Sequence, residues 1–98
     1  MLPVLHGDVC AAARVLLRTP PTSREALCRR MIVEADVADR HLRRTGRPHP
    51  LFGNGSLMSA ARKRVLADEP GFDDPDYCLC FETVLRALVA RSQEVFGT

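Results

Sequence analysis

Long apolar runs are absent from this sequence of 98 residues. Its uninterrupted hydrophobic stretches span only a few residues, as in Met31-Ile32-Val33, whereas a helix needs about 20 apolar residues to cross a bilayer. We therefore expect no membrane-spanning segment. The apolar opening, residues 1–5, has no basic flank and is soon followed by Gly7-Asp8, so we also expect no signal peptide. These absences predict a cytoplasmic protein with reduced cysteines.

Metal-binding spacings are missing as well, although the chain has four cysteines and three histidines. No C-x-x-C or H-x-x-x-H pattern occurs, and Cys78 and Cys80 are separated by one residue. On a helix, side chains two residues apart point about 200° away from each other, so these two thiols cannot hold one ion. We predict no metal and no cofactor, and we expect the cysteines to be buried as small apolar residues.

Catalytic constellations are also missing. His41 and His49 lie near Asp36 and Asp39 in the sequence and could supply acid and base groups, but no nucleophile accompanies them. Without a nucleophile, a metal cluster or a cofactor motif, we predict that the protein is not an enzyme.

A glycine-rich turn, Gly53-Asn54-Gly55-Ser56, precedes an expected helix and resembles a phosphate cradle. A P-loop would continue with Lys and Ser or Thr, but this chain continues with Leu57 and Met58. We interpret the turn as a helix N-cap and keep anion binding as the alternative.

The bulk composition is that of an ordinary globular protein. Hydrophobic residues make up 46% and charged residues 27% of the chain, and the formal net charge is only +2. The chain is too short for two domains to bury separate cores, so we predict one helical domain over residues 1–98. A net charge this small does not by itself drive nucleic-acid binding.

Helix start and stop signals divide the first half of the chain into two segments. Asp8 is a candidate N-cap for a helix that should end near Arg18, before the breaking Thr19-Pro20-Pro21. Thr22 and Glu25 have the spacing of a capping box, and the helix that they start should run to about Thr45, ahead of Gly46 and Pro48.

The second half contains two more helix signals. A short helix is expected from Ser56 to about Ala67, with Val65 and Leu66 facing the core. Asp74 can cap a last helix with Pro75 at its first position, extending to about Phe96. Its core arc should hold Tyr77, Phe81, Val84, Leu85, Leu88 and Val95. The pattern predicts an all-α fold, a compact four-helix domain with two long and two short helices.

The helix of residues 22–45 has two apolar sides. Its main stripe consists of Leu27 or Cys28, Met31, Ala35, Ala38 and Leu42. A second strip, Ala26, Val33 and Val37, lies about 200–240° away from Met31 and is bordered by Arg30, Arg40 and Arg44. Either this helix runs through the centre of the domain, or the second strip and its arginines form a protein interface.

Basic residues give a candidate nucleic-acid or anion contact at Arg43, Arg62, Lys63 and Arg64. Acidic residues are interleaved with them, and the i,i+4 pairs Asp36 with Arg40 and Asp39 with Arg43 should neutralise part of this charge. We therefore favour a solvated charged face and keep contact with nucleic acid or an acidic partner as the alternative.

Two stretches, His49 to Met58 (HPLFGNGSLM) and Asp73 to Cys78 (DDPDYC), resemble a small uncharacterised helical protein family of alphaproteobacteria. The resemblance spans most of the chain and implies a bacterial cytoplasmic protein, and it transfers no activity or catalytic residue. It also suggests an association with phage-derived gene clusters.

Together these patterns predict a non-enzymatic adaptor or assembly module that acts through protein–protein contacts, with a protein partner or a second copy of the chain. The setting that we expect for it is a phage-derived or DNA-handling system. The alternative is a small DNA-binding regulator that uses the Arg-rich helix faces.

Overall fold

The structure, a computed structural model, describes residues 1–96 and the side chains of residues 1–94. It contains α1 (His6–Leu17), a single 3-10 turn (Pro21–Ser23), α2 (Arg24–Thr45), α3 (Leu57–Ala61) and α4 (Pro75–Phe96). The prediction of an all-α fold with two long and two short helices is confirmed, since α2 and α4 each have 22 residues. None of the described helices is both long and apolar enough to span a bilayer.

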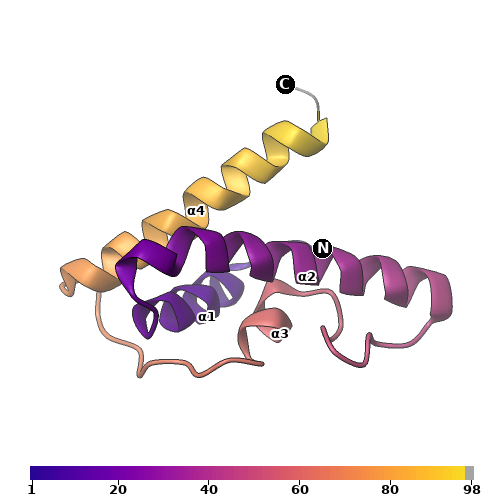
Figure 1. The fold of residues 1–98 in the computed structure, drawn as a ribbon, viewed down its shortest axis with the longest axis horizontal. Coiled ribbons are helices and arrows are strands. Elements are labelled where there is room, and N and C mark those ends of the chain that lie inside the picture. The colour runs from indigo at the N-terminus through magenta and orange to yellow at the C-terminus, as the bar shows by residue number, and fades with distance from the viewer. Residues whose placement is uncertain (97–98) are drawn as a thin grey trace.

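The two long helices run in the same direction, and α1 lies against both of them (Figure 1). α3 packs between α1 and α2, beneath α2 in the view of Figure 1. In the view of Figure 1 the C-terminal end of α4 extends beyond the core, although Arg91 still pairs with Asp36 of α2. One hydrophobic cluster joins all four helices, and its largest fully buried side chains include Leu16, Met31, Leu57 and Tyr77.

The central helix is α1, because nearly every side chain from Asp8 to Leu16 is buried. Its alanines at positions 11–13 are small, which lets neighbouring backbones approach closely. The hypothesis that the helix of residues 22–45 runs through the centre is therefore wrong. Ala26 and Val33 are exposed and Val37 is only half-buried, so the second strip faces outward.

The capping predictions have mixed outcomes. Asp74 caps α4 as predicted, because its Oδ1 accepts hydrogen bonds from the backbone N–H groups of Asp76 (2.9 Å) and Tyr77 (3.1 Å). The capping box of Thr22 and Glu25 is not formed: residues 21–23 make a 3-10 turn, and α2 begins at Arg24 without a side-chain cap.

Asp8 is not the N-cap of α1, which begins two residues earlier at His6. Its buried carboxylate accepts hydrogen bonds from the N–H of Leu5 (2.9 Å) and from the N–H of Met58 (2.9 Å). The same side chain therefore caps α1 from within its first turn and joins the helix to the start of α3.

α3 ends at Ala61, six residues before the predicted end. The backbone of Ala67 donates to the carbonyl of Arg14 (3.1 Å), and the Arg14 Nε donates to the carbonyl of Ala67 (2.7 Å). These two bonds hold the following segment in a non-helical conformation against α1. Val65 is consequently exposed rather than facing the core, whereas Leu66 packs against it.

The core arc of α4 is partly as predicted. Tyr77 and Val84 are fully buried and Leu88 packs at the edge of the core, but Leu85 is exposed. α1 has only 12 residues, so it cannot cover the whole length of α4. The predicted place of Val95 lies outside the described side chains.

Candidate functional site

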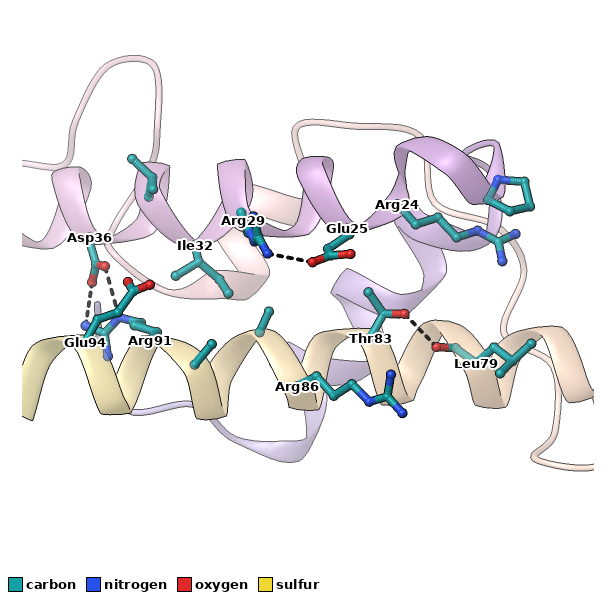
Figure 2. A pocket seen from close by; sticks show the side chains of 14 residues that line it. Arg24, Glu25, Arg29, Ile32, Asp36, Leu79, Thr83, Arg86, Arg91 and Glu94 are labelled. Atoms are coloured by element: carbon teal, nitrogen blue, oxygen red, sulfur yellow. Dashed lines mark hydrogen bonds and ion pairs between the residues drawn. The ribbon is translucent and has the colours of Figure 1, made fainter. Parts of the chain in front are cut away.

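A groove of about 700 Å³ lies between α2 and α4. In Figure 2, Asp36 and Ile32 project from α2 toward α4, and Thr83 and Arg91 project from α4 toward α2, whereas Arg86 points away from α2. The apolar residues of the groove are Pro21 from the 3-10 turn, Ile32 and Val33 from α2, and Leu79, Ala87 and Ala90 from α4. The groove exists because the alanines of α4 are too small to fill the space between the helices.

An ion pair joins the two helices at each end of this groove. At one end Arg24 donates to both carboxylate oxygens of Asp76, at 2.7 and 3.1 Å. The Nε of the buried Arg24 also donates to the carbonyls of Leu16 (2.8 Å) and Thr19 (3.0 Å), which fixes its position. The hydrogen bonds from Arg24 lower the pKa of Asp76 below its usual value.

At the other end Arg91 donates to Asp36 at 3.0 and 2.7 Å (Figure 2). The same carboxylate accepts a hydrogen bond from the N-terminal ammonium group of Met1 (2.7 Å). Burial by itself would raise the pKa of Asp36, but the hydrogen bonds from Arg91 and from the ammonium group outweigh it and lower the pKa. The carboxylate is therefore charged at neutral pH.

The rims of the groove carry charges of both signs. Glu25 and Arg29 pair with each other along the α2 rim, and Arg86 and Glu94 lie along the α4 rim. Such an arrangement is typical of a protein-binding surface, in which an apolar centre is surrounded by polar residues.

The predicted interface residues do not form one surface. Val33, which is 59% exposed, lines the groove, but Ala26 and Arg30 are exposed outside it. Val37, Arg40 and Arg44 line a separate, smaller pocket with His41 and His49.

Sequence reasoning missed the α4 side of the groove, although a signal was present. Thr83, Ala87, Ala90 and Glu94 recur at spacings of four, three and four residues, which places them on one helical face. The sequence alone is sufficient to find small residues such as Thr83, Ala87 and Ala90 on one face of a long helix. It does not identify the helix that packs opposite them.

The predicted nucleic-acid contacts are mostly engaged within the protein. Arg64 donates two hydrogen bonds of 2.9 Å to the carboxylate of Glu34, and Arg43 pairs with Asp39 at 3.1 Å as the sequence predicted. The Lys63 ammonium lies 5.0 Å from the centre of the Phe52 ring. Arg62 is exposed, so these four cations do not form a continuous unpaired patch.

The glycine-rich turn acts as the predicted N-cap. Ser56 Oγ accepts a hydrogen bond from the N–H of Ser59 (3.0 Å), and Asn54 Oδ1 accepts one from the N–H of Ser56 (3.0 Å). These amides are occupied by the turn itself, and α3 has only five residues. The turn therefore does not favour anion binding.

The cysteines and histidines show no metal-binding geometry in the part of the chain that the structure describes. Cys10, Cys28 and Cys80 are buried, as expected of small apolar side chains, and Cys78 is half-buried. Burial raises the pKa of the Cys28 thiol to about 11.

A family described as a domain of unknown function, DUF7742, matches residues 2–88. No curated protein matches the chain, and no solved structure does.

Proposed function

We propose that this chain, which belongs to the DUF7742 family of domains of unknown function, is a non-enzymatic adaptor that binds a helical segment of a partner protein. The observation that supports this proposal is the groove between α2 and α4, which has apolar residues at its centre and is open to solvent. Apolar grooves of this kind bind amphipathic helices through anchors at i, i+3 or i+4, and i+7.

The length of the groove supports a helix rather than a small molecule as the ligand. Its lining on α4 extends from Leu79 to Glu94, which corresponds to about 22 Å of helix rise, or roughly four turns. The ion pairs at the two ends hold α2 and α4 apart at a set distance, so the groove is present before a partner arrives. Such pre-organisation lowers the entropic cost of binding.

The charges on the rims favour a partner helix with both acidic and basic residues beside its apolar face. A helix bound in the groove would lie between Glu25 and Arg29 on the α2 rim and Arg86 and Glu94 on the α4 rim. Complementary charges at these positions would set the register and orientation of the bound helix.

The experiment that tests the adaptor role compares the same substitution at two exposed apolar residues of α4. Leu79 and Val89 are each 58% exposed, but only Leu79 lines the groove. Affinity purification from the native cells uses three tagged chains: the wild type, Leu79→Asp and Val89→Asp. Quantitative mass spectrometry then measures the proteins that each chain retains. We expect a protein that the wild type and Val89→Asp retain and that Leu79→Asp loses, because a charge at an apolar contact is costly to desolvate.

The purified partner is then titrated against the three chains by calorimetry, and Leu79→Asp should weaken binding by at least about tenfold. Circular dichroism of the variants controls for folding. Equal retention by all three chains, or no protein retained by any of them, would rule out the groove as the binding site.

The alternative function, a small DNA-binding regulator, has less support because Arg43 and Arg64 already pair with carboxylates. We propose the cytoplasm of a bacterium as the site of action, in keeping with four cysteines that are all free. A gel shift with duplex DNA at low salt tests the alternative, since phosphate contacts are strongest there.

A further inference from the structure

A second pocket, of about 290 Å³, lies at the C-terminal half of α2. It is lined by Val37, Arg40, His41 and Arg44 from α2 and by His49 from the following loop. No carboxylate is among these lining residues, and none of them lines the groove between α2 and α4. The pocket therefore combines two guanidinium groups and two imidazoles with no negative charge of its own.

Arg40 and Arg44 are among the arginines of this protein that carry no carboxylate partner in the described part of the chain. Within residues 1–94 they make no ion pair, whereas ion pairs to carboxylates occupy Arg24, Arg29, Arg43, Arg64, Arg86 and Arg91. Asp36, one turn before Arg40, is the carboxylate that sequence spacing assigns to it. The structure directs Asp36 to Arg91 instead, which leaves the charge of Arg40 unbalanced.

The histidine from the loop is held in one tautomer. His49 Nδ1 accepts hydrogen bonds from the backbone N–H groups of Leu51 (3.0 Å) and Phe52 (3.1 Å). The neutral ring must therefore carry its proton on Nε2, which makes Nε2–H a donor. Desolvation and the charges of His41 and Lys63 lower the pKa of His49, so the neutral form prevails at neutral pH.

The loop that carries His49 is fixed by several contacts. The backbones of His49 and Gly53 exchange two hydrogen bonds, of 2.9 and 3.1 Å. The His49 ring stacks on Phe52 at 4.6 Å between centroids and meets the edge of His41 at 4.9 Å. Gly55 then brings the chain against Asp39 of α2 so closely that a Cβ atom would lie 2.8 Å from the Asp39 Cα. The position of the His49 ring is thus fixed before a ligand arrives.

We propose that this pocket binds the phosphate group of a phosphomonoester, with Arg40, Arg44 and His49 Nε2–H as the donors. A phosphomonoester carries a charge of about −1.5 to −2 at pH 7, which two guanidinium groups balance. Arginine also matches the geometry of phosphate oxygens through paired N–H donors. The proposal does not depend on the adaptor function, because the two sites share no lining residue.

A single phosphate group fits the observations better than a nucleic-acid backbone. The donors line one pocket of about 290 Å³, whereas a backbone requires cations spread along successive phosphates. The neighbouring Arg43 and Arg64 pair with Asp39 and Glu34, which removes two of the cations that a nucleic-acid backbone would need beside the pocket.

The test is an NMR titration of the full chain that follows the arginine Nε–H and histidine Cε1–H signals at constant ionic strength. The probes are inorganic phosphate, O-phosphoserine and a 12-base-pair DNA duplex. We expect saturable shifts of the Arg40, Arg44 and His49 signals with phosphate and with O-phosphoserine.

Matched variants locate the site. Arg40→Gln and Arg44→Gln should each weaken O-phosphoserine binding by at least tenfold, and both positions are exposed, so the fold should survive. Arg30→Gln is the control, since Arg30 is also exposed and makes no ion pair in the described residues. Arg30 lies about 15 Å from Arg40 along the same helix. Shifts that do not saturate, an equal loss in Arg30→Gln, or tighter binding of the duplex than of O-phosphoserine at these signals would overturn the proposal.

Discussion

Arg91 donates two hydrogen bonds to Asp36, at 3.0 and 2.7 Å, and this ion pair links α4 to α2. It closes one end of the groove, and it engages the Asp36 carboxylate so that Arg40 does not pair with it. One tertiary contact therefore shapes both candidate sites, the apolar groove and the basic pocket.

Removing this ion pair should destabilise the protein. Arg91→Gln leaves the partly buried Asp36 with fewer donors, and we expect the free energy of unfolding to fall by roughly 1–2 kcal/mol. Arg86→Gln is the control, because Arg86 pairs with Glu82 on the exposed surface and should change stability by less than about 0.5 kcal/mol. Urea denaturation measures both variants. Equal effects would show that the pair of Arg91 and Asp36 adds nothing beyond a surface contact.

Acid should weaken the contacts between α2 and α4. The folded-state pKa values of Asp36 and Asp76 lie below their usual value, which is about 3.9 in an unfolded chain. Their stabilising contribution is therefore complete above that pH and is lost as the pH falls through the lower, folded-state values. Thermal melts between pH 2 and pH 6 should show a steep fall in Tm below about pH 4. Asp36→Asn should start lower at pH 7 and show a shallower fall, and an identical slope would contradict the assignment.

The cysteines should differ in reactivity. Cys28 is fully buried, and burial raises its pKa to about 11, so little thiolate is present at pH 8. Cys78 is only half-buried. We expect iodoacetamide to modify Cys78 first in the native protein, and to modify Cys28 roughly two orders of magnitude more slowly than in the unfolded chain. Peptide mapping by mass spectrometry reads out each site, with a sample in denaturant as the control.

Two glycines with positive φ should respond differently to alanine. Gly55 has a φ of 95°, and an added Cβ would lie 2.8 Å from the backbone of Asp39. Gly55→Ala should therefore cost roughly 2–4 kcal/mol. Gly46 has a φ of 73° with nothing within 4 Å of the added atom, so Gly46→Ala should cost only about 1 kcal/mol. Chemical denaturation compares the two, and similar losses would show that contact with α2 does not constrain the loop.

Local sequence signals determined the helical class and several boundaries of this protein. Asp74 and Pro75 start α4, and Gly46 ends α2 in the left-handed conformation. The stripe of Met31, Ala35 and Ala38 also faces the core as its spacing predicts. These outcomes depend on interactions within a few residues of the chain, so the sequence alone is sufficient to predict them.

Tertiary structure determined the outcome wherever a segment or side chain had more than one available partner. α3 stops at Ala61 because the backbone around Ala67 pairs with Arg14 of α1, and no local pattern encodes that partner. Asp36 had an arginine one turn away in sequence, but the packing of α4 against α2 supplied Arg91 with two hydrogen bonds. A partner that is distant in the sequence becomes available only after the helices have packed together. For this reason, the groove and the basic pocket could not be predicted from the sequence.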